Sequence, residues 1–346
     1  MRLECEVFAR TGLLGNPSDG YFGKTIACLV GNFKARVAFT ESASLRLEAH
    51  PRFDPLEFQS IAELASVFGD QGYYGGQRLV QATLKRFFEV CAARGIVLDG
   101  PNFTLSYDTG IPRQVGMAGS SAIIIATLRC LLGWYHLYDQ LAQWELPTIA
   151  METETEELGI TAGMMDRVVQ TYGGALYMNF AQELLTGRGY GDYTRIAPNT
   201  LPPLYIAFVL HGAESGKIHS DVRRRWNAGD PEVRAAMCEF AGFAEAGRAA
   251  LDAGDFQSFG ALMNANFALR RRIFGDGVLG PDNLRMAELA QRYGFPATTC
   301  GSGGAIVGIQ GDEERHTAFT DALTAEGFHV QQVTVGPEYG WHEVSS

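Results

Sequence analysis

Residues 116–138 begin as a turn rich in glycine and serine and continue as a run that is apolar on nearly every side. The run reads GMAGSSAIIIATLRCLLGWYHLY. A helix without a polar face is stable only where other elements cover it all round. We therefore expect a buried helix at the centre of a substantial core. A chain of 346 residues, 46% of them hydrophobic, can supply such a core.

Shorter strands and helices surround this run in the first 200 residues. Alternating apolar residues predict strands, and apolar residues at helical spacing predict helices. The expected strands are 4–15, 26–40, 103–112 and 174–180. The expected helices are 77–94, ending at Gly95, and 144–159, with Pro147 in its first turn.

The chain changes character near residue 200, where NTLPPLYIAFVL joins a proline-marked junction to an apolar strand. The elements expected after it are helices over 231–251, 255–273 and 282–293, and strands over 304–310 and 329–335. This order indicates an α+β protein rather than the regular βα alternation of a Rossmann fold. We expect two domains, residues 1–200 and 201–346.

Charge and composition argue against several classes of protein. The net charge of −11 disfavours a nucleic-acid-binding protein, although a small pocket can still be locally basic. The six cysteines include no CxxC pair, which disfavours a zinc or redox site. The N-terminal sequence MRLECEVFAR lacks the apolar core of a signal peptide, and no apolar run reaches 18 residues. We expect a cytoplasmic protein that binds neither nucleic acid nor membrane.

The stretch 116–122 is suited to holding phosphate. It lacks the lysine of a Walker loop. Its glycines nevertheless let backbone N–H groups converge, and the following helix adds the positive end of its dipole. The alternative is a serine that simply caps a buried helix.

The stretch 9–24, ARTGLLGNPSDGYFGK, brings a second set of polar residues to the end of a strand. Arg10 lies in the strand, and Asp19 lies in the turn that follows. The alternative to a ligand-binding role is an ordinary turn built by Asn-Pro-Ser-Asp.

The stretch 151–174 carries four acids at the end of a helix and then a glycine-containing loop that leads to Asp166. Carboxylates are hard oxygen ligands that suit Mg²⁺. Acids at a helix C-terminus oppose the helix dipole, so their crowding requires a reason. The alternative is a solvated acidic surface.

The stretch 298–308, TTCGSGGAIVG, is a second glycine-rich loop before a strand. Alone it is weak evidence, because a bulged hairpin turn has the same composition.

Together and in this order, the four stretches resemble the GHMP kinases, the superfamily of galactokinase, homoserine kinase and mevalonate kinase. The phosphate motif P-x3-G-[LM]-x-S-S is matched by Pro112, Gly116 and Met117, with one extra residue before the two serines. The later acidic motif of the family is matched by Glu154, Gly159, Gly163 and Asp166. The late loop, here C-G-S-G-G, lacks the usual lysine.

Five stretches show a narrower resemblance, to the glucuronokinases. They are LLGNPSDGYFGKT, YYGGQRL, GIPRQVGMAGSSAI, ELGITAGMMDRV and SGKIHSDVRRRW, and they extend to about residue 226. The resemblance implies transfer of a phosphoryl group from ATP to the anomeric hydroxyl of D-glucuronate. It also implies an N-terminal domain like ribosomal protein S5 domain 2 and a ferredoxin-like C-terminal domain, with a small-molecule site between them in a monomer or homodimer.

The same resemblance implies the roles of individual residues. Asp166 and Arg10 would be catalytic. The residues that bind ATP would be Gly116, Met117, Ala118, Gly119, Ser120, Ser121 and Ala122. Mg²⁺ would be held by Ser120 or Ser121 together with Glu154, although Glu156 and Glu157 lie within one turn of Glu154. The residues that bind the sugar would be Asn16, Asp19, Tyr21, Arg113 and Gly303.

Glucuronate carries a carboxylate at C6, which a specific site should pair with arginine. The candidate partners are Arg113, Arg223, Arg224, Arg225, Lys217 and His219. For 223–225 the alternative is a solvated helix face. Tyr73, Tyr74, Gly75 and Gly76 either border the adenine or sugar pocket or form a packed turn.

Two rival functions remain open at the level of sequence. One is a GHMP kinase for another sugar, such as galactose, which would need no cation for a carboxylate. The other is an inactive sugar- and ATP-binding regulator. A regulator should have lost the arginine or the acid, whereas Arg10, Glu154 and Asp166 are all present.

Overall fold

Two β-sheets organise the computed structural model, which describes residues 1–64, 66, 75–210 and 220–341. The larger sheet contains β1 (Arg2–Leu14), β2 (Lys24–Glu41), β3 (Arg46–Leu47), β4 (Phe103–Thr109), β5 (Ala175–Asn179) and β6 (Asp192–Ile196). The smaller sheet contains β7 (Leu204–Phe208), β8 (Ala297–Thr299), β9 (Ala305–Ile309) and β10 (His329–Gln332). The predicted α+β class is confirmed.

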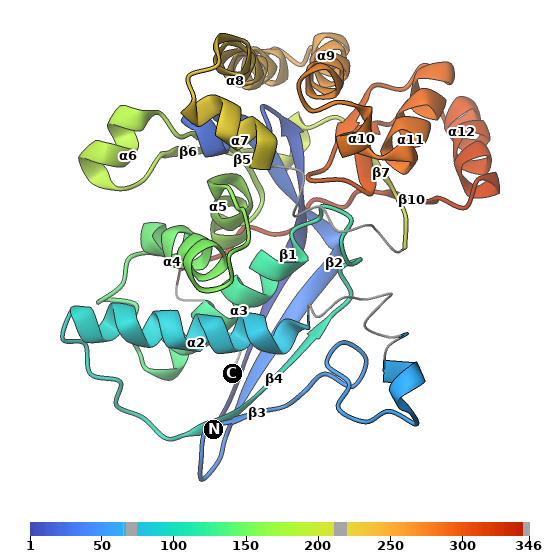
Figure 1. Ribbon diagram of the computed structural model, residues 1–346. Helices are drawn as coiled ribbons and strands as arrows, with labels where there is room; N and C mark the ends of the chain where they lie inside the picture. Colours follow the sequence, from blue (N-terminus) through green and yellow to red (C-terminus); the bar gives the residue numbers. More distant parts are fainter. Residues whose placement is uncertain (65, 67–74, 211–219, 342–346) are drawn as a thin grey trace.

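The long strands β1 and β2 form the spine of the larger sheet (Figure 1). They pair antiparallel from Arg2 opposite Thr40 to Leu14 opposite Ile26. The second half of β2 pairs with β4 and its first half with β5, so the sheet order is β3-β4-β2-β5-β6. The turn between β1 and β2 therefore lies at one end of the sheet, and it carries Asn16 and Asp19.

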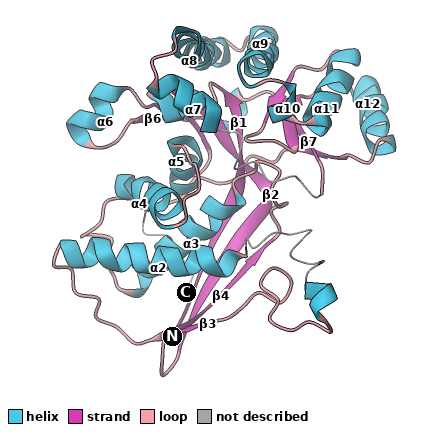
Figure 2. Ribbon diagram, in the orientation of Figure 1, coloured by secondary structure: helices cyan, strands magenta, loops and turns pink. Residues whose placement is uncertain are grey.

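Helices of the first half lie to one side of this spine, except α6, which lies apart from it next to β6 (Figure 2). They are α2 (Gly76–Ala93), α3 (Gly119–Trp134), α4 (Leu146–Glu152), α5 (Met164–Tyr172) and α6 (Gln182–Arg188). The predicted helix over 77–94 is confirmed as α2. The helix predicted over 144–159 is shorter, because a π-helical turn, Thr153–Glu157, follows α4.

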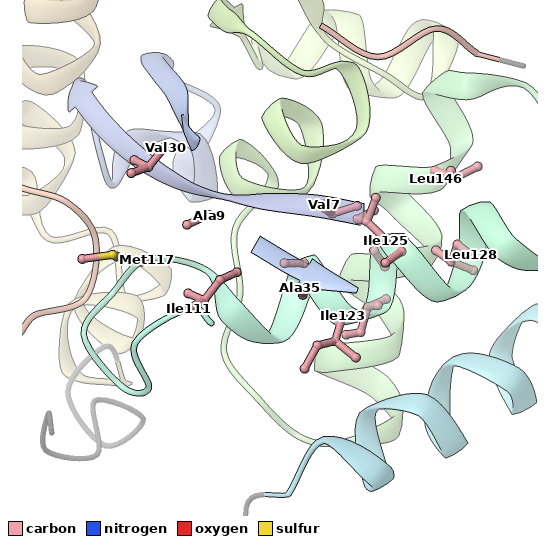
Figure 3. Close-up of a cluster of buried hydrophobic side chains, with 14 of the residues drawn as sticks. Val7, Ala9, Val30, Ala35, Ile111, Met117, Ile123, Ile125, Leu128 and Leu146 are labelled. Carbon is pink, nitrogen blue, oxygen red and sulfur yellow. The ribbon is translucent and has the colours of Figure 1, made fainter. Parts of the chain in front are cut away.

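Helix α3 is the buried helix that the apolar run predicts. Every residue from Ser121 to Trp134 is buried. Figure 3 shows Ile123, Ile125 and Leu128 of this helix among other buried apolar side chains of the strands and of α4. Full burial stabilises each such side chain by about 1.5–3 kcal/mol, so α3 anchors the core and fixes where its own N-terminus points.

The second half places its helices around the smaller sheet and over one end of the larger sheet (Figure 1). They are α7 (Ser220–Asn227), α8 (Pro231–Asp252), α9 (Phe256–Phe274), α10 (Asp276–Leu279), α11 (Pro281–Arg292) and α12 (Glu313–Ala325). The helices predicted over 231–251, 255–273 and 282–293 are confirmed. Aspartate side chains cap α8, α9 and α12, which accounts for their sharp starts.

The two halves share one apolar core that includes Ile206 of β7, Ala244 of α8 and Phe259 of α9. The sheets change between β6 and β7, where we expect the boundary. Residues after β10 return to the first half, where Tyr339 Oη accepts a hydrogen bond from the Phe8 N–H at 3.0 Å. The division into domains 1–200 and 201–346 stays a prediction.

The cysteines are free thiols, all buried except Cys238. Among the described residues, no helix combines the length and the apolar character needed to cross a membrane.

Candidate active site

A cavity of about 610 Å³ lies where the first-half loops meet the second half of the chain. Its wall includes the turn after β1, the start of α3 and residues of α5, α7, α9 and the late glycine-rich loop. Six arginines and three acids line it: Arg10, Arg78, Arg113, Arg167, Arg223 and Arg270, with Asp19, Glu154 and Asp166. On a protein of net charge −11, this cavity is locally basic and suits anionic ligands.

Arg10 and Asp166 form a two-pronged ion pair in this cavity. Arg10 Nε donates to Asp166 Oδ1 and Nη2 donates to Oδ2, each at 2.6 Å. Burial opposes the charge of Arg10, but the carboxylate of Asp166 outweighs it and raises the pKa of Arg10. The side chain of Asp166 keeps 17% of its surface exposed, against 5% for Arg10. The pair thus leaves the carboxylate reachable from the cavity.

The loop 116–122 and the late glycine-rich loop both hold Arg10 through backbone oxygens. Arg10 Nη1 donates to the carbonyl oxygens of Gly116 at 2.6 Å and Cys300 at 2.9 Å. A side chain at Gly301 would lie within 2.9 Å of both terminal nitrogens of Arg10. The late loop joins the antiparallel strands β8 and β9, so it is a hairpin turn and also a wall of the site.

Gly303 does not line the cavity; its neighbours Gly301 and Ser302 do. Its backbone nitrogen would lie 3.0 Å from a Cβ at Gly116, which has a positive φ of 72°. The two glycine-rich loops thus pack backbone against backbone. This close packing gives Gly303 a structural role, and its binding of the sugar stays a prediction.

Neither serine caps helix α3. The residue before the helix is Ala118, in the left-handed conformation, and no side chain caps the helix. The loop from Gly116 to Ser120 lines the cavity, so the helix presents its N-terminus to that space. Such a terminus binds anions through backbone N–H groups and the helix dipole.

The two serines point to different places. Ser120 lines the cavity, and its hydroxyl donates to Glu154 Oε1 at 2.6 Å. Ser121 is fully buried, and its hydroxyl donates to Gln170 Oε1 at 2.6 Å. Ser120 and Glu154 are therefore the oxygen donors that could hold a cation here. Among the described residues, no group of three or more His, Cys, Asp or Glu side chains could do so alone.

The π-helical turn separates Glu154 from the other acids of its segment. Glu152 accepts from Arg86 at 3.1 Å, and Glu157 accepts from Lys85 at 2.8 Å. Glu156 also pairs with Arg86, at 3.1 Å. These three acids face the cations of α2, whereas Glu154 lines the cavity and is paired with Arg167. The acidic crowding at the end of α4 is thus balanced by basic side chains.

Asp19 is buried at the base of the cavity. Its Oδ2 accepts from the Met165 N–H at 3.0 Å, next to Asp166 in the first turn of α5. A Cβ at Gly163 would lie 2.2 Å from the same oxygen, so glycine is required there. Burial raises the pKa of Asp19 to about 6, and the Asp166 charge adds to this. Tyr21 and Asn16 line the same part of the cavity.

The basic residues proposed from the sequence are divided by the structure. Arg223 lines the cavity, while Arg224 pairs with Asp221, and Arg225 pairs with Asp230 at 2.7 Å. Arg113 also lines it, on the side where its guanidinium lies 5.2 Å from the centre of the Phe53 ring. Gly75 and Gly76 border the cavity. The proposals for Tyr73, Tyr74, Lys217 and His219 lie outside the described residues.

Sequence reasoning missed Arg270, which is buried in the wall of the cavity. It lies on α9 with Met263, Asn266 and Ile273, all of them buried at helical spacing. Arg271 and Arg272 instead form exposed ion pairs. The inward register of α9 could have identified Arg270 as the arginine that this helix turns toward the core.

Family models and named relatives match this chain over most of its length. The model of the GHMP kinases N-terminal domain matches residues 78–174, and that of the C-terminal domain matches residues 248–329. Probable glucuronokinase 2 of Arabidopsis thaliana is 47% identical over 301 residues, covering 87% of this chain and 82% of the relative. Glucuronokinase 1 of the same plant is 43% identical over 337 residues, covering 97% and 92%.

Solved structures show the same fold. The galactokinase of Lactococcus lactis, complexed with galactose, superposes with a TM-score of 0.74 at 16% identity, covering 97% of this chain and 94% of that one. This likeness confirms the expected two-domain fold. With two family models matched and relatives above 40% identity over most of its length, the chain belongs to the GHMP kinase family and groups within it with the glucuronokinases.

Proposed function

We propose that this protein phosphorylates the anomeric hydroxyl of D-glucuronate with ATP and releases glucuronate 1-phosphate and ADP. The Arg10–Asp166 pair beside the open N-terminus of α3 is the observation that carries the proposal. With these roles, an acceptor for the proton, a positive charge and a loop that binds phosphate would share one cavity. The two glucuronokinases of Arabidopsis thaliana support the choice of sugar.

Phosphoryl transfer depends mainly on alignment and on neutralising charge. The loop 116–122 would hold the ATP phosphates against the backbone N–H groups at the start of α3. The sugar oxygen would form its bond to the γ-phosphorus as the bond to ADP breaks. The proton of the hydroxyl would pass to Asp166. Arg10 holds that carboxylate in place, and it adds positive charge beside the transferred group.

Mg²⁺ suits the donors that Ser120 and Glu154 provide. Both are hard oxygen ligands, and Mg²⁺ in kinases commonly takes one or two protein oxygens together with phosphate oxygens and water. The Ser120 hydroxyl and Glu154 Oε1 already lie 2.6 Å apart. When bound, the cation would neutralise the charge of the phosphates. The Ser121 hydroxyl donates to Gln170, so we assign Ser121 to the phosphate loop and not to the metal site.

The turn after β1 would bind the sugar. Asp19, when ionised, accepts hydrogen bonds from sugar hydroxyls, and it lies beside the residue that receives the proton. Asn16 and Tyr21 offer further polar atoms from the same turn. This arrangement would bring the anomeric hydroxyl between Asp166 and the γ-phosphate.

A substrate panel tests the proposal. ADP release by the purified protein is measured with ATP, Mg²⁺ and each of glucuronate, galacturonate, galactose and glucose, and phosphorus NMR locates the new phosphate on the sugar. We expect the highest kcat/KM with glucuronate and a phosphate on C1. Activity on neutral sugars without activity on glucuronate would disprove the choice of substrate while leaving the kinase chemistry intact.

A further inference from the structure

Two of the arginines that line the cavity differ from Arg10 and Arg167 in having no carboxylate as an ion-pair partner among the described residues. Arg10 is paired with Asp166, and Arg167 is paired with Glu154. Arg270 and Arg223, in contrast, form no ion pair with any residue that the structure describes. Both line the cavity. Resting on the function proposed above, we infer that Arg270 and Arg223 together bind the C6 carboxylate of the sugar acid and so set the preference for glucuronate over neutral sugars.

Arg270 is a buried cation that lacks a counter-charge in contact. It is 2% exposed, and Nη1 donates to Asn16 Oδ1 at 2.7 Å. Its guanidinium also lies 5.2 Å from the centre of the Phe274 ring. One neutral oxygen and one ring do not satisfy the five N–H groups of a guanidinium. Burial lowers the pKa of Arg270 to about 10, with the Arg10 charge adding to the effect. An anion in the cavity would relieve this cost.

Arg223 reaches the same place from α7. Its Nη1 donates to the carbonyl oxygen of Gly20 at 2.8 Å, and its guanidinium lies 4.2 Å from the centre of the Tyr21 ring. A Cβ at Gly20 would come within 2.9 Å of Arg223 Nη2, so glycine leaves room for this approach. Stacking and one carbonyl fix the plane of the guanidinium while its remaining N–H groups stay available.

The charges of both arginines act on Tyr21. Positive charge from both Arg223 and Arg270 opposes the burial-driven rise in the pKa of Tyr21. They come from helices α7 and α9 of the second half, and both donate to the turn after β1, Arg223 to Gly20 and Arg270 to Asn16. Two guanidinium groups on one turn suit a carboxylate, which accepts several hydrogen bonds in one plane.

The position of Arg270 and Arg223 relative to Asp166 agrees with the geometry of the sugar ring. In a pyranose the anomeric carbon and C5 flank the ring oxygen, so the carboxylate on C5 lies on the same edge of the ring as the reacting hydroxyl. In the structure, Asp19 connects the residues assigned to these two groups. Asp19 contacts the backbone next to Asp166, and its charge also acts on Arg270. A sugar oriented toward Asp166 would therefore bring its carboxylate toward Arg270 and Arg223.

The test compares Arg270→Met and Arg223→Met with the unaltered protein, using glucuronate and its uncharged amide as paired substrates. We expect each variant to raise KM for glucuronate by roughly 10- to 100-fold, the loss of a charge-assisted hydrogen bond. The preference for glucuronate over the amide should fall by the same factor. KM for ATP should stay within about twofold, because the partners of these arginines, Gly20 and Tyr21 for Arg223 and Asn16 and Phe274 for Arg270, lie outside the phosphate loop.

Arg224→Met is the matched control. Arg224 neighbours Arg223 on α7 but is exposed and paired with Asp221, so its replacement should change neither KM. Arg270→Lys keeps the buried charge and loses the planar fork, and it serves if the methionine variant does not fold; it should still lower the preference. Circular dichroism and a melting curve verify folding of each variant.

Two results would overturn the inference. One is an unchanged preference in the folded Arg223 and Arg270 variants. The other is an equal rise in KM for ATP, which would assign these arginines to the phosphates. Either result can occur with an unaltered protein that phosphorylates glucuronate well, so the failure of this inference is distinguishable from failure of the proposed function.

Discussion

Arg10 and Arg270 are both buried in the wall of one cavity, and they differ in what neutralises them. Two nitrogens of Arg10 each donate to an oxygen of the Asp166 carboxylate at 2.6 Å, and this carboxylate raises the pKa of Arg10. Arg270 has the neutral oxygen of Asn16, and its pKa is lowered to about 10 by burial. A buried charge without a partner is costly to the folded protein.

The difference separates two kinds of binding group. Around Arg10 the charges of Arg10 and Asp166 neutralise each other, and we call this part of the cavity the balanced end. Its geometry therefore exists before any ligand arrives, as catalysis requires. Around Arg270 and Arg223 the positive charge has no carboxylate partner among the described residues, and we call this part the unbalanced end. An anion that enters the cavity would neutralise it. Substitutions at the balanced end should therefore change kcat most, and substitutions at the unbalanced end should change KM for the sugar most.

Asp166→Asn breaks the balanced end and should have the largest effect. The amide cannot take up the proton of the hydroxyl, so kcat should fall by roughly 10²- to 10⁴-fold. It also leaves the buried charge of Arg10 without a counter-ion, which should destabilise the protein by about 3 kcal/mol. Steady-state kinetics and urea unfolding measure the two effects. A variant that kept most of its kcat would remove Asp166 from the mechanism.

The Arg271–Asp276 pair provides the matched control. Arg271 Nε and Nη2 donate to the two oxygens of Asp276 at 2.6 and 2.8 Å, the same two-pronged arrangement. Both side chains are about half exposed. Asp276→Asn should therefore cost less than about 1 kcal/mol and leave kcat unchanged. The contrast shows whether the effect of Asp166→Asn comes from its place in the cavity.

The family resemblance, which the order of motifs along the chain carries, predicts that Arg10, the loop 116–122 and Asp166 share a site. The structure brings Arg10, residues 116–120 and Asp166 into one cavity, and their roles stay a prediction. The apolar character of α3 predicted its burial, because a helix without a polar face has few other places to go. The burial of α3 is a local feature that can be read from consecutive residues, whereas Arg10 and Asp166 lie 156 positions apart and are brought together in the sequence only by the resemblance.

The unbalanced end depends on contacts that the sequence does not display. Arg270 meets Asn16 across 254 positions of the chain. Which acid of the 152–157 segment faces the cavity depends on a π-helical turn and on two cations of α2, Lys85 and Arg86. Spacing alone left these choices open, since three glutamates lie within one turn.

Ser120→Ala and Ser121→Ala test which of the two serines binds Mg²⁺ at the balanced end. Ser120→Ala removes an oxygen donor beside Glu154 and should raise the Mg²⁺ concentration for half-maximal activity by about tenfold. Ser121→Ala removes a buried hydrogen bond to Gln170 and should cost about 1–3 kcal/mol of stability. A Mg²⁺ titration and a urea melt of both variants measure this. A larger Mg²⁺ effect in Ser121→Ala would reverse the assignment.

Asp19 lies between the two ends, and its charge acts on both Arg10 and Arg270. Its pKa rises from 3.8 in the unfolded chain to about 6 in the folded protein, mainly through burial. The folded state therefore binds more protons between about pH 4 and pH 6, and the contribution of Asp19 to stability falls as the pH rises through that window. The cost at pH 7 is about 3 kcal/mol.

Asp19→Asn should remove this pH dependence while weakening sugar binding. Urea melts from pH 4 to pH 7 should show the unaltered protein losing stability relative to the variant as the pH rises. The kcat/KM of the unaltered protein for glucuronate should instead rise with pH. Below pH 6 it should fall by up to about tenfold for each pH unit, because Asp19 gains a proton and stops accepting hydrogen bonds from the sugar hydroxyls. Parallel stability curves for the two proteins would show that Asp19 ionises normally, and the link between the two ends would then have to pass through other groups.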